Sequence, residues 1–72
     1  MEQELRQRIG LNMRIERVRR GYTQERLAEL AEVSTKHITK IENSKATPSI
    51  YLMYKIAKAL DVSIDTLVSR EI

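Results

Sequence analysis

Two closely spaced helix start signals, at Thr23 and Ser34, constrain this chain more than any other feature. Side chains of these types accept a hydrogen bond from an unpaired backbone N–H in the first turn of a helix, so both residues are good N-caps. Each cap is also flanked by the apolar pair of a hydrophobic staple. The staple pairs are Tyr22 with Leu27 and Val33 with Ile38. We therefore predict helices over residues 24–31 and 35–43, joined by only three residues.

The apolar residues of this segment have the spacing of two amphipathic helices that pack against each other. They are Leu27, Ala28, Ala31, Val33, Ile38 and Ile41. A connection this short forces the helices to cross steeply, and the two alanines let the backbones approach. Such a crossing pair has the geometry of the DNA-binding helix-turn-helix, whose second helix lies in the major groove. Short helical hairpins also occur in proteins that never touch DNA, so the spacing alone leaves both interpretations open.

The outward face of the second helix carries only hydrogen-bonding or basic residues. They are Thr35, Lys36, His37, Thr39 and Lys40. In a helix-turn-helix, the residues nearest the N-terminus of this helix enter the groove deepest. Lysine can donate to guanine O6 and N7, and threonine can offer its hydroxyl to a base or pack its methyl group on thymine. We therefore predict that Thr35, Lys36, Thr39 and Lys40 read bases, although polar outer faces are also normal on helices that bind nothing.

Positive charge is concentrated in two segments of the chain, whose overall net charge is +3. Residues 34–58 contain five lysines and one acidic residue, and residues 1–20 contain six arginines and three acidic residues. Residues 23–33 and 59–72 are net acidic. This distribution is expected of a phosphate-facing surface with an acidic back. A soluble helical protein with an uneven surface is the alternative.

The N-terminal part of the chain predicts a helix over residues 3–20. It places Leu5, Ile9 and Met13 on one stripe, and Gly21 can take the left-handed conformation that closes a helix. A second apolar stripe lies on another side of this helix and consists of Leu11, Ile15 and Val18. This second stripe indicates either additional core or a subunit contact.

Two further helices follow the central pair. We expect Thr47 to cap a helix over residues 48–60, with Pro48 at the first position, where the missing N–H costs nothing. The predicted inward stripe of this helix is Ile50, Met53, Ile56, Ala57 and Leu60. Ser63 is expected to cap a last helix over residues 64–70. The whole chain therefore predicts one small all-α domain of five helices.

Three ordered motifs closely resemble the lambda-repressor-like helix-turn-helix family, the Cro and phage-repressor type. They are T-Q-E-x-L-A at residues 23–28, V-S-x-x-x-I-x-K-I-E-N at residues 33–43, and P-S-x-x-x-x-x-x-I-A-x-A-L at residues 48–60. The resemblance extends to Ile9-Gly10 and Arg17 upstream and to Val62-Ser63 and Leu67 downstream, and it covers about nine-tenths of the chain. It implies an all-α, compact five-helix lambda-repressor-like domain whose second and third helices form the helix-turn-helix.

The resemblance also implies roles for residues around the helix-turn-helix. Family members that keep an arginine and a glutamate at Arg17 and Glu42 often pair them across the domain, so we expect a partly buried salt bridge here. An ordinary exposed pair is the alternative. The glutamine at Gln24 contacts the DNA backbone in this family, and a helix N-terminus already favours an anion. In this family, the loop that follows the second helix of the helix-turn-helix lies against the sugar-phosphate strand of DNA. The full predicted set of phosphate-contacting residues is Thr23, Gln24, His37, Asn43 and Lys45.

Two positions depart from the family pattern at the helix ends. Glu32 and Ser44 stand where glycine is frequent. A residue other than glycine that is forced to positive φ is strained by ~1 kcal/mol. The helix-turn-helix tolerates such replacements, so we expect the fold to be retained with some local strain.

Composition and motif content exclude several other classes of function. The chain contains no cysteine, and its single histidine, His37, has no ligand partner, so we expect no metal. No Gly-rich phosphate loop and no recurring acidic pair supports an enzyme or a cofactor site. No apolar run approaches the ~18 residues needed to span a bilayer, and residues 1–10 lack a signal-peptide core. We expect a cytoplasmic protein that is not an enzyme and does not enter a membrane.

Leftover apolar residues in the C-terminal third indicate a homodimer, although they could instead complete the core of the monomer. The predicted contact consists of Leu52, Ile64, Val68 and Ile72. Two domains related by a two-fold axis would meet half-sites ~34–36 Å apart. We therefore expect a sequence-specific double-stranded DNA-binding transcriptional regulator, a repressor in preference to an activator, that binds a palindromic operator as a dimer. A protein-interaction module of the same fold, such as an adaptor or part of an antitoxin, is the competing hypothesis.

Overall fold

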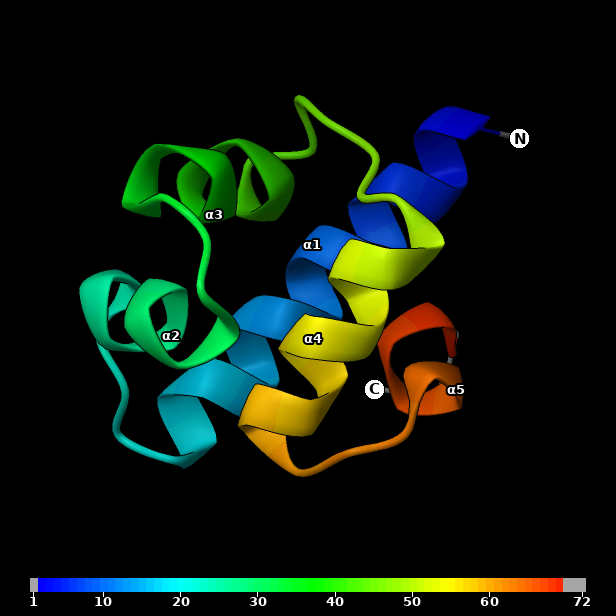
Figure 1. Ribbon diagram of the computed structural model, residues 1–72. Helices are drawn as coiled ribbons and strands as arrows, with labels where there is room; N and C mark the ends of the chain where they lie inside the picture. The colour runs from blue at the N-terminus through cyan, green and yellow to red at the C-terminus, as the bar shows by residue number, and fades with distance from the viewer. Residues whose placement is uncertain (1, 70–72) are drawn as a thin grey trace.

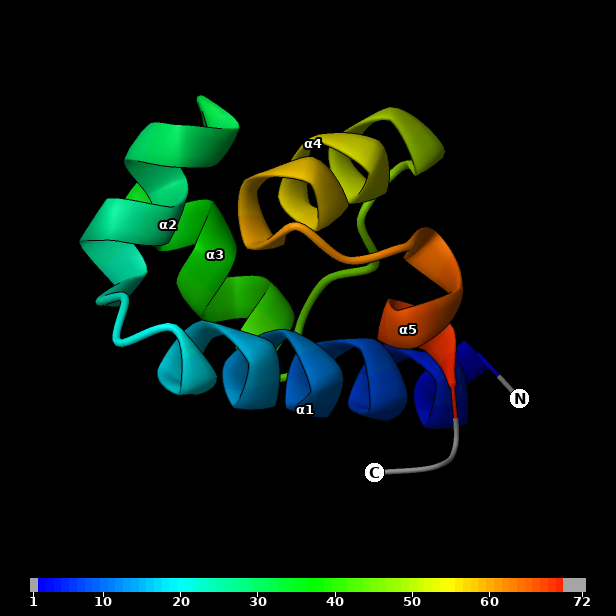
Figure 2. The same ribbon diagram turned by 90° about the horizontal axis from the view of Figure 1, so that it is seen from below.

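Five helices form the described part of the computed structural model, residues 2–69 (Figure 1). They are α1 (Glu2–Arg19), α2 (Gln24–Ala31), α3 (Thr35–Glu42), α4 (Ile50–Leu60) and α5 (Ile64–Val68). Figure 2 shows α1 as a base along which the other four helices lie. α1 packs against α3 and α5, whereas α2 packs against α3 and α4. The predicted all-α, five-helix class is therefore confirmed. Among the described residues, no helix combines the length and apolar character needed to cross a membrane.

Three of the predicted start signals are helix caps in the structure. The hydroxyls of Thr23, Ser34 and Ser63 each accept a hydrogen bond from the backbone N–H three residues later, at 3.0, 3.1 and 3.2 Å. The apolar residues that precede these caps pack against the core, as a hydrophobic staple requires. These residues are Tyr22, Val33 and Val62. Local chemistry therefore sets the entry of the chain into α2, α3 and α5.

The start of α4 differs from the prediction. We predicted Thr47 as the cap and Pro48 as the first helical residue, whereas the helix begins at Ile50 and its cap is Ser49. The Oγ atom of Ser49 accepts a hydrogen bond from the backbone N–H of Leu52 at 3.1 Å. The predicted cap and first residue are therefore both wrong, by two positions.

Burial of the staple residues explains the choice of cap. With Ser49 as the cap, the staple positions fall on Pro48 and Met53, which are both buried. With Thr47 as the cap, the second staple position would fall on Tyr51, which is 67% exposed. A helix capped by Ser49 therefore buries both of its staple side chains, whereas a helix capped by Thr47 would leave one of them exposed.

The core contains side chains from all five helices. Its buried apolar residues are Ile9, Met13, Leu27, Ala28, Ala31, Ile38, Ile41, Leu52, Met53, Ile56, Ala57, Leu60 and Leu67. Leu52 is 7% exposed, so its assignment to a dimer contact is wrong, and Ile50, predicted to face inward, is 74% exposed. Leu52 lies one turn before Ile56 on the buried stripe, whereas Ile50 lies at the edge of this stripe, on the first residue of α4.

The backbones of α1 and α3 approach closely at Gly10. A Cβ atom at this position would lie 2.5 Å from the carbonyl oxygen of Ile41 and 2.9 Å from that of Glu42. Such distances are closer than any side chain tolerates, so glycine is required here. This close approach brings the C-terminal turn of α3 onto α1.

The second apolar stripe of α1 is not part of the core. Leu11 is 47% exposed and Val18 is 61% exposed. Of the two alternatives that the sequence leaves open for these residues, additional core is therefore wrong. A subunit contact through this stripe remains a prediction.

Within residues 2–69, three residues other than glycine have left-handed backbone conformations. They are Glu32, Ser44 and Asp61, with φ values of 60°, 62° and 59°. Each lies just after the end of a helix. This conformation lets backbone N–H groups that follow the helix donate hydrogen bonds to carbonyl oxygens of its last turns. Glu32 and Ser44 are the positions at which the family pattern indicates glycine, and Asp61 adds a third such position.

Candidate nucleic-acid interface

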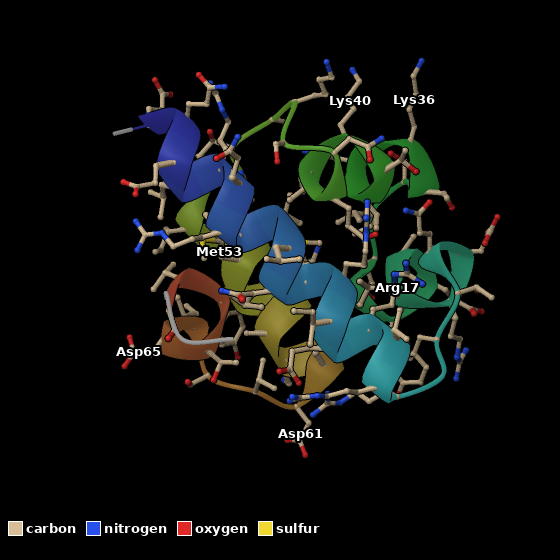
Figure 3. The ribbon with its side chains drawn as sticks, turned by 180° about the vertical axis from the view of Figure 1, so that it is seen from behind. Arg17, Lys36, Lys40, Met53, Asp61 and Asp65 are labelled. Carbon is tan, nitrogen blue, oxygen red and sulfur yellow. The ribbon has the colours of Figure 1, made fainter. Side chains whose placement is uncertain are left out.

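α3 presents two lysines away from the rest of the protein. Lys36 and Lys40 lie one turn apart, are exposed, and project in the same direction (Figure 3). Thr35 and Thr39 lie on the same side of α3 and are half-buried. α5 packs on α1 and α4, at the opposite end of the molecule from α3 (Figure 1). The four predicted base-reading residues therefore share one side of α3, and α5 does not cover them.

A shallow hollow borders the two lysines. Lys36, His37 and Lys40 line it, together with Ser34 and Ala46. Ser34 caps the start of α3, and Ala46 belongs to the loop between α3 and α4. The hollow therefore brings the single histidine, which is exposed, next to the candidate base-reading residues.

Arg17 and Glu42 form a two-point ion pair beneath α3. The Nε atom of Arg17 lies 2.7 Å from Oε2 of Glu42, and Nη2 lies 3.2 Å from Oε1. The Glu42 side chain is fully buried, and the Arg17 side chain is 14% exposed. Arg17 also donates from Nη1 to the carbonyl oxygen of Tyr22 at 2.8 Å. The pair that the resemblance implies is thus present in its buried form, and it ties α1 to α3 and to the segment before α2.

Gln24, the first residue of α2, is held between two residues of α3. Its Nε2 atom donates to Oε1 of Glu42 at 3.0 Å, and its Oε1 atom accepts from the Thr39 hydroxyl at 2.8 Å. A candidate phosphate-contacting residue and a candidate base-reading residue are therefore hydrogen-bonded to each other. The sequence pattern did not indicate this contact, because it depends on how α2 and α3 cross.

Arg14 is a second arginine of this region that the sequence analysis did not single out. Its Nε atom lies 3.7 Å from Oε1 of Glu42, and its Nη2 atom lies 3.5 Å from Oδ1 of Asn43. The side chain is 51% exposed. Its position one turn before Arg17 is a signal that could have placed it beside the same glutamate. Two arginines facing one carboxylate leave an excess positive charge at the C-terminal end of α3.

The remaining predicted residues lie at several places around this region. Thr23, Asn43 and Lys45 are exposed, and the Thr23 hydroxyl is engaged as the cap of α2. Of the remaining residues of the predicted dimer contact, Ile64 and Val68 are half-buried on α5. Ile72 lies outside the described residues.

A family model described as helix-turn-helix matches residues 13–67. The chain belongs to this helix-turn-helix family. The match includes both helices of the crossing pair and the whole of α4, so the family and the all-helical architecture agree. The resemblance to lambda-repressor-like helix-turn-helix proteins is confirmed.

Regulators from Bacillus have helix-turn-helix sequences similar to this chain. The HTH-type transcriptional regulator SinR from Bacillus licheniformis is 36% identical over 64 residues, which are 88% of this chain and 58% of SinR. SinR from Bacillus subtilis matches to the same extent. The chain thus spans less than two-thirds of the length of these relatives.

Solved structures of other proteins resemble this chain over most of its length. A hypothetical transcription factor, NHTF from Neisseria, has a TM-score of 0.89 and 30% identity, over 96% of this chain and 79% of that chain. The restriction-modification controller protein C.AhdI from Aeromonas hydrophila has a TM-score of 0.83 and 27% identity, over 86% of this chain and 94% of that chain.

Proposed function

We propose that this helix-turn-helix protein is a sequence-specific, double-stranded DNA-binding transcriptional regulator with α3 as its recognition helix. The observation that carries the proposal is the joint projection of Lys36 and Lys40 from the exposed side of α3 (Figure 3). The opposite side of α3 is anchored by Ile38 and Ile41, which lie in the core. It is also anchored by the ion pair between Glu42 of α3 and Arg17 of α1. A rigid helix that offers flexible cationic donors suits the donor and acceptor pattern of the major groove.

The proposed contacts divide into base readout and phosphate positioning. Lys36 and Lys40 contact base edges, with Thr35 beside Lys36. The fourth predicted base-reading residue, Thr39, has its hydroxyl engaged within the protein. The phosphate-contacting residues are Thr23, Gln24, His37, Asn43 and Lys45.

The charge distribution supports a single DNA-facing side. Figure 3 shows Lys36 and Lys40 at one end of the molecule, whereas Asp61 and Asp65 lie toward the other end. DNA phosphates attract the first end and repel the second. The protein therefore approaches a duplex with α3 leading.

We further propose that the protein represses transcription as a homodimer on a palindromic operator. Only three lysines of one copy, Lys36, Lys40 and Lys45, belong to the proposed contacts, and two copies would double the number of contacts with DNA. The described residues span 30 Å in their longest direction, so two copies side by side suit half-sites ~34–36 Å apart. Ile64 and Val68 of α5, with Ile72 beyond the described residues, form the proposed contact. Such a dimer would cover the operator and occlude polymerase.

One observation favours the competing function, a protein-interaction module of the same fold. The residues Ile50, Tyr51 and Tyr54 of α4 are 74%, 67% and 52% exposed, which is extensive apolar surface for a small domain. A chain that had lost DNA binding could use this surface for a protein partner. A protein-interaction module of this kind would not require exposed lysines along α3.

The salt dependence of DNA binding separates the two functions. Affinity for a random-sequence duplex is measured by fluorescence anisotropy over a series of salt concentrations. A dimer that neutralises ~8 phosphates gives a slope of log K against log salt near −7, and a flat response supports the interaction module. The double variant Lys36→Gln/Lys40→Gln should weaken binding, because it removes two positive charges from the proposed DNA-facing side. The double variant Lys55→Gln/Lys58→Gln removes the same charge from α4 and should change binding much less.

A further inference from the structure

We infer that Thr39 is a positioning residue that holds the Gln24 amide toward a DNA phosphate, and that it does not read a base. This inference rests on the proposed function, because it assigns a role within the same DNA interface. It replaces a base-reading role for Thr39 that the position of this residue on α3 had indicated. The hydrogen bonds of three side chains carry the argument: Thr39, Gln24 and Glu42.

The orientation of the Gln24 amide follows from the chemistry of its two neighbours. The Glu42 carboxylate already accepts two hydrogen bonds from Arg17, so it acts only as an acceptor toward Gln24. The nitrogen of the amide must therefore face Glu42, at 3.0 Å, and the oxygen must face away from it. The atom that meets this oxygen is the Thr39 hydroxyl, at 2.8 Å. Only a hydroxyl that donates can satisfy this arrangement.

The donor capacity of Thr39 is consequently used inside the protein. A threonine hydroxyl carries one hydrogen, and both acceptors within reach of it belong to the chain: the Gln24 amide oxygen at 2.8 Å and the Thr35 carbonyl oxygen at 3.1 Å. Donation to a base edge would require loss of both contacts. Thr39 is also half-buried, whereas Lys36 and Lys40 are exposed.

The Gln24 amide keeps one hydrogen for an outside partner. Its nitrogen carries two hydrogens, and Glu42 takes one of them; no other acceptor for this nitrogen occurs within residues 2–69. Gln24 is only half-buried and begins α2, where the unpaired N–H groups and the helix dipole favour an anion. The remaining hydrogen is thus held, before binding, in a region suited to a phosphate.

Holding the side chain in advance raises affinity because less conformational freedom is lost on binding. Fixing a long side chain at an interface costs roughly 2- to 10-fold in affinity, and Thr39 and Glu42 remove most of this cost for Gln24. The benefit is the same for every DNA sequence, since a phosphate carries no base information. A base-reading threonine would instead affect one position of the operator.

Thr39→Val tests the inference, because valine keeps the shape of threonine and removes the hydroxyl. We expect affinity for operator and random duplex to fall by the same factor, roughly 2- to 10-fold, with an unchanged base preference in selection from a random pool. Thr39→Ser, which keeps the hydroxyl, should bind as the wild type does. In a Gln24→Ala background, Thr39→Val should have no further effect.

Two results would overturn the inference. One is a base preference that relaxes at a single operator position in Thr39→Val. The other is a fall in affinity on Thr39→Val that is as large in the Gln24→Ala background as in the wild type. A separate readout keeps the test independent of the proposed function: the Gln24 side-chain amide signals in the NMR spectrum of the free protein. Thr39→Val should shift these signals and Thr39→Ser should not, whether or not the wild type binds DNA; unchanged signals in Thr39→Val would contradict the positioning role.

Discussion

The carboxylate of Glu42 accepts two hydrogen bonds from the guanidinium of Arg17, at 2.7 and 3.2 Å, across 25 positions of the sequence. The Glu42 side chain is fully buried, so the pair lies inside the protein. It joins α1 to the C-terminal turn of α3 and therefore holds the proposed recognition helix on the scaffold. A buried carboxylate that loses its partner keeps an uncompensated charge, which costs more than the pair itself contributes.

Arg17→Met should therefore destabilise the protein strongly. We expect the free energy of unfolding to fall by about 3–5 kcal/mol, measured by urea denaturation. Arg19→Met is the matched control, because Arg19 pairs with Glu16 at 3.1 Å but its side chain is 68% exposed. Loss of such a surface pair should cost about 0–1 kcal/mol. Equal small effects of the two substitutions would show that the buried pair does not anchor α3.

Gly10→Ala should destabilise the protein more than Gly21→Ala does. The added methyl group at Gly10 would meet the backbone of α3, with the carbonyl oxygen of Ile41 only 2.5 Å away, so the helices must move apart at a cost of about 1–3 kcal/mol. At Gly21 the φ of +70° costs about 1 kcal/mol for alanine, but the space is open. Thermal unfolding gives the order of the two variants, and DNA affinity should fall only for Gly10→Ala, since only this change displaces α3.

Glu32→Gly should stabilise the protein. Glu32 has a φ of 60°, which strains any residue that carries a Cβ, and glycine would relieve about 1 kcal/mol. The contact that Glu32 makes with Lys55 uses the backbone carbonyl, so it survives the substitution. Glu29→Gly, inside α2, should have the opposite sign, because glycine costs about 1 kcal/mol in a helix interior. A lower melting temperature for Glu32→Gly than for the wild type would refute this explanation of the turn.

Lys36→Gln and Lys45→Gln should change DNA binding in different ways. Lys36 lies on the proposed base-reading side of α3, so its loss should cost about 1–3 kcal/mol at the preferred operator and relax the preference at one base pair. Lys45 lies in the loop after α3, and its loss should weaken binding to all sequences alike and reduce the salt slope by about 1. Binding to operator and scrambled duplexes measures both effects. The assignment of roles fails if the two variants behave alike.

Much of the fold could be predicted because local signals and tertiary packing agree. Thr23, Ser34 and Ser63 cap the helices that they were predicted to cap, since each hydroxyl needs only the next turn of its own helix. The inward stripe of α1 was equally accessible, as Ile9 and Met13 are fully buried. At the start of α4, both Thr47 and Ser49 have side chains that can cap a helix, so local chemistry alone did not identify the cap. Burial of the side chains that follow favours Ser49.

The parts of the site that depend on crossing angles could not be predicted from spacing. The contacts from Gln24 to Thr39 and Glu42 join residues 15 and 18 positions apart, and no helical period relates them. Leu52 is buried and Ile50 is exposed, which is the reverse of the prediction. The cause is similar, because the neighbouring helices determine which residues at the edge of an apolar stripe are covered. Only the pairing of Arg17 with Glu42 was anticipated over such a distance, through the family resemblance.

Selection of bound duplexes from a random DNA pool tests the central proposal most directly. The wild-type protein should enrich one sequence made of two inverted half-sites whose centres are about one helical turn, or ~34–36 Å, apart. Lys36→Gln and Lys40→Gln should each alter the enriched bases. Enrichment of no sequence at low salt, by a protein shown to be folded, would contradict a DNA-reading role for α3.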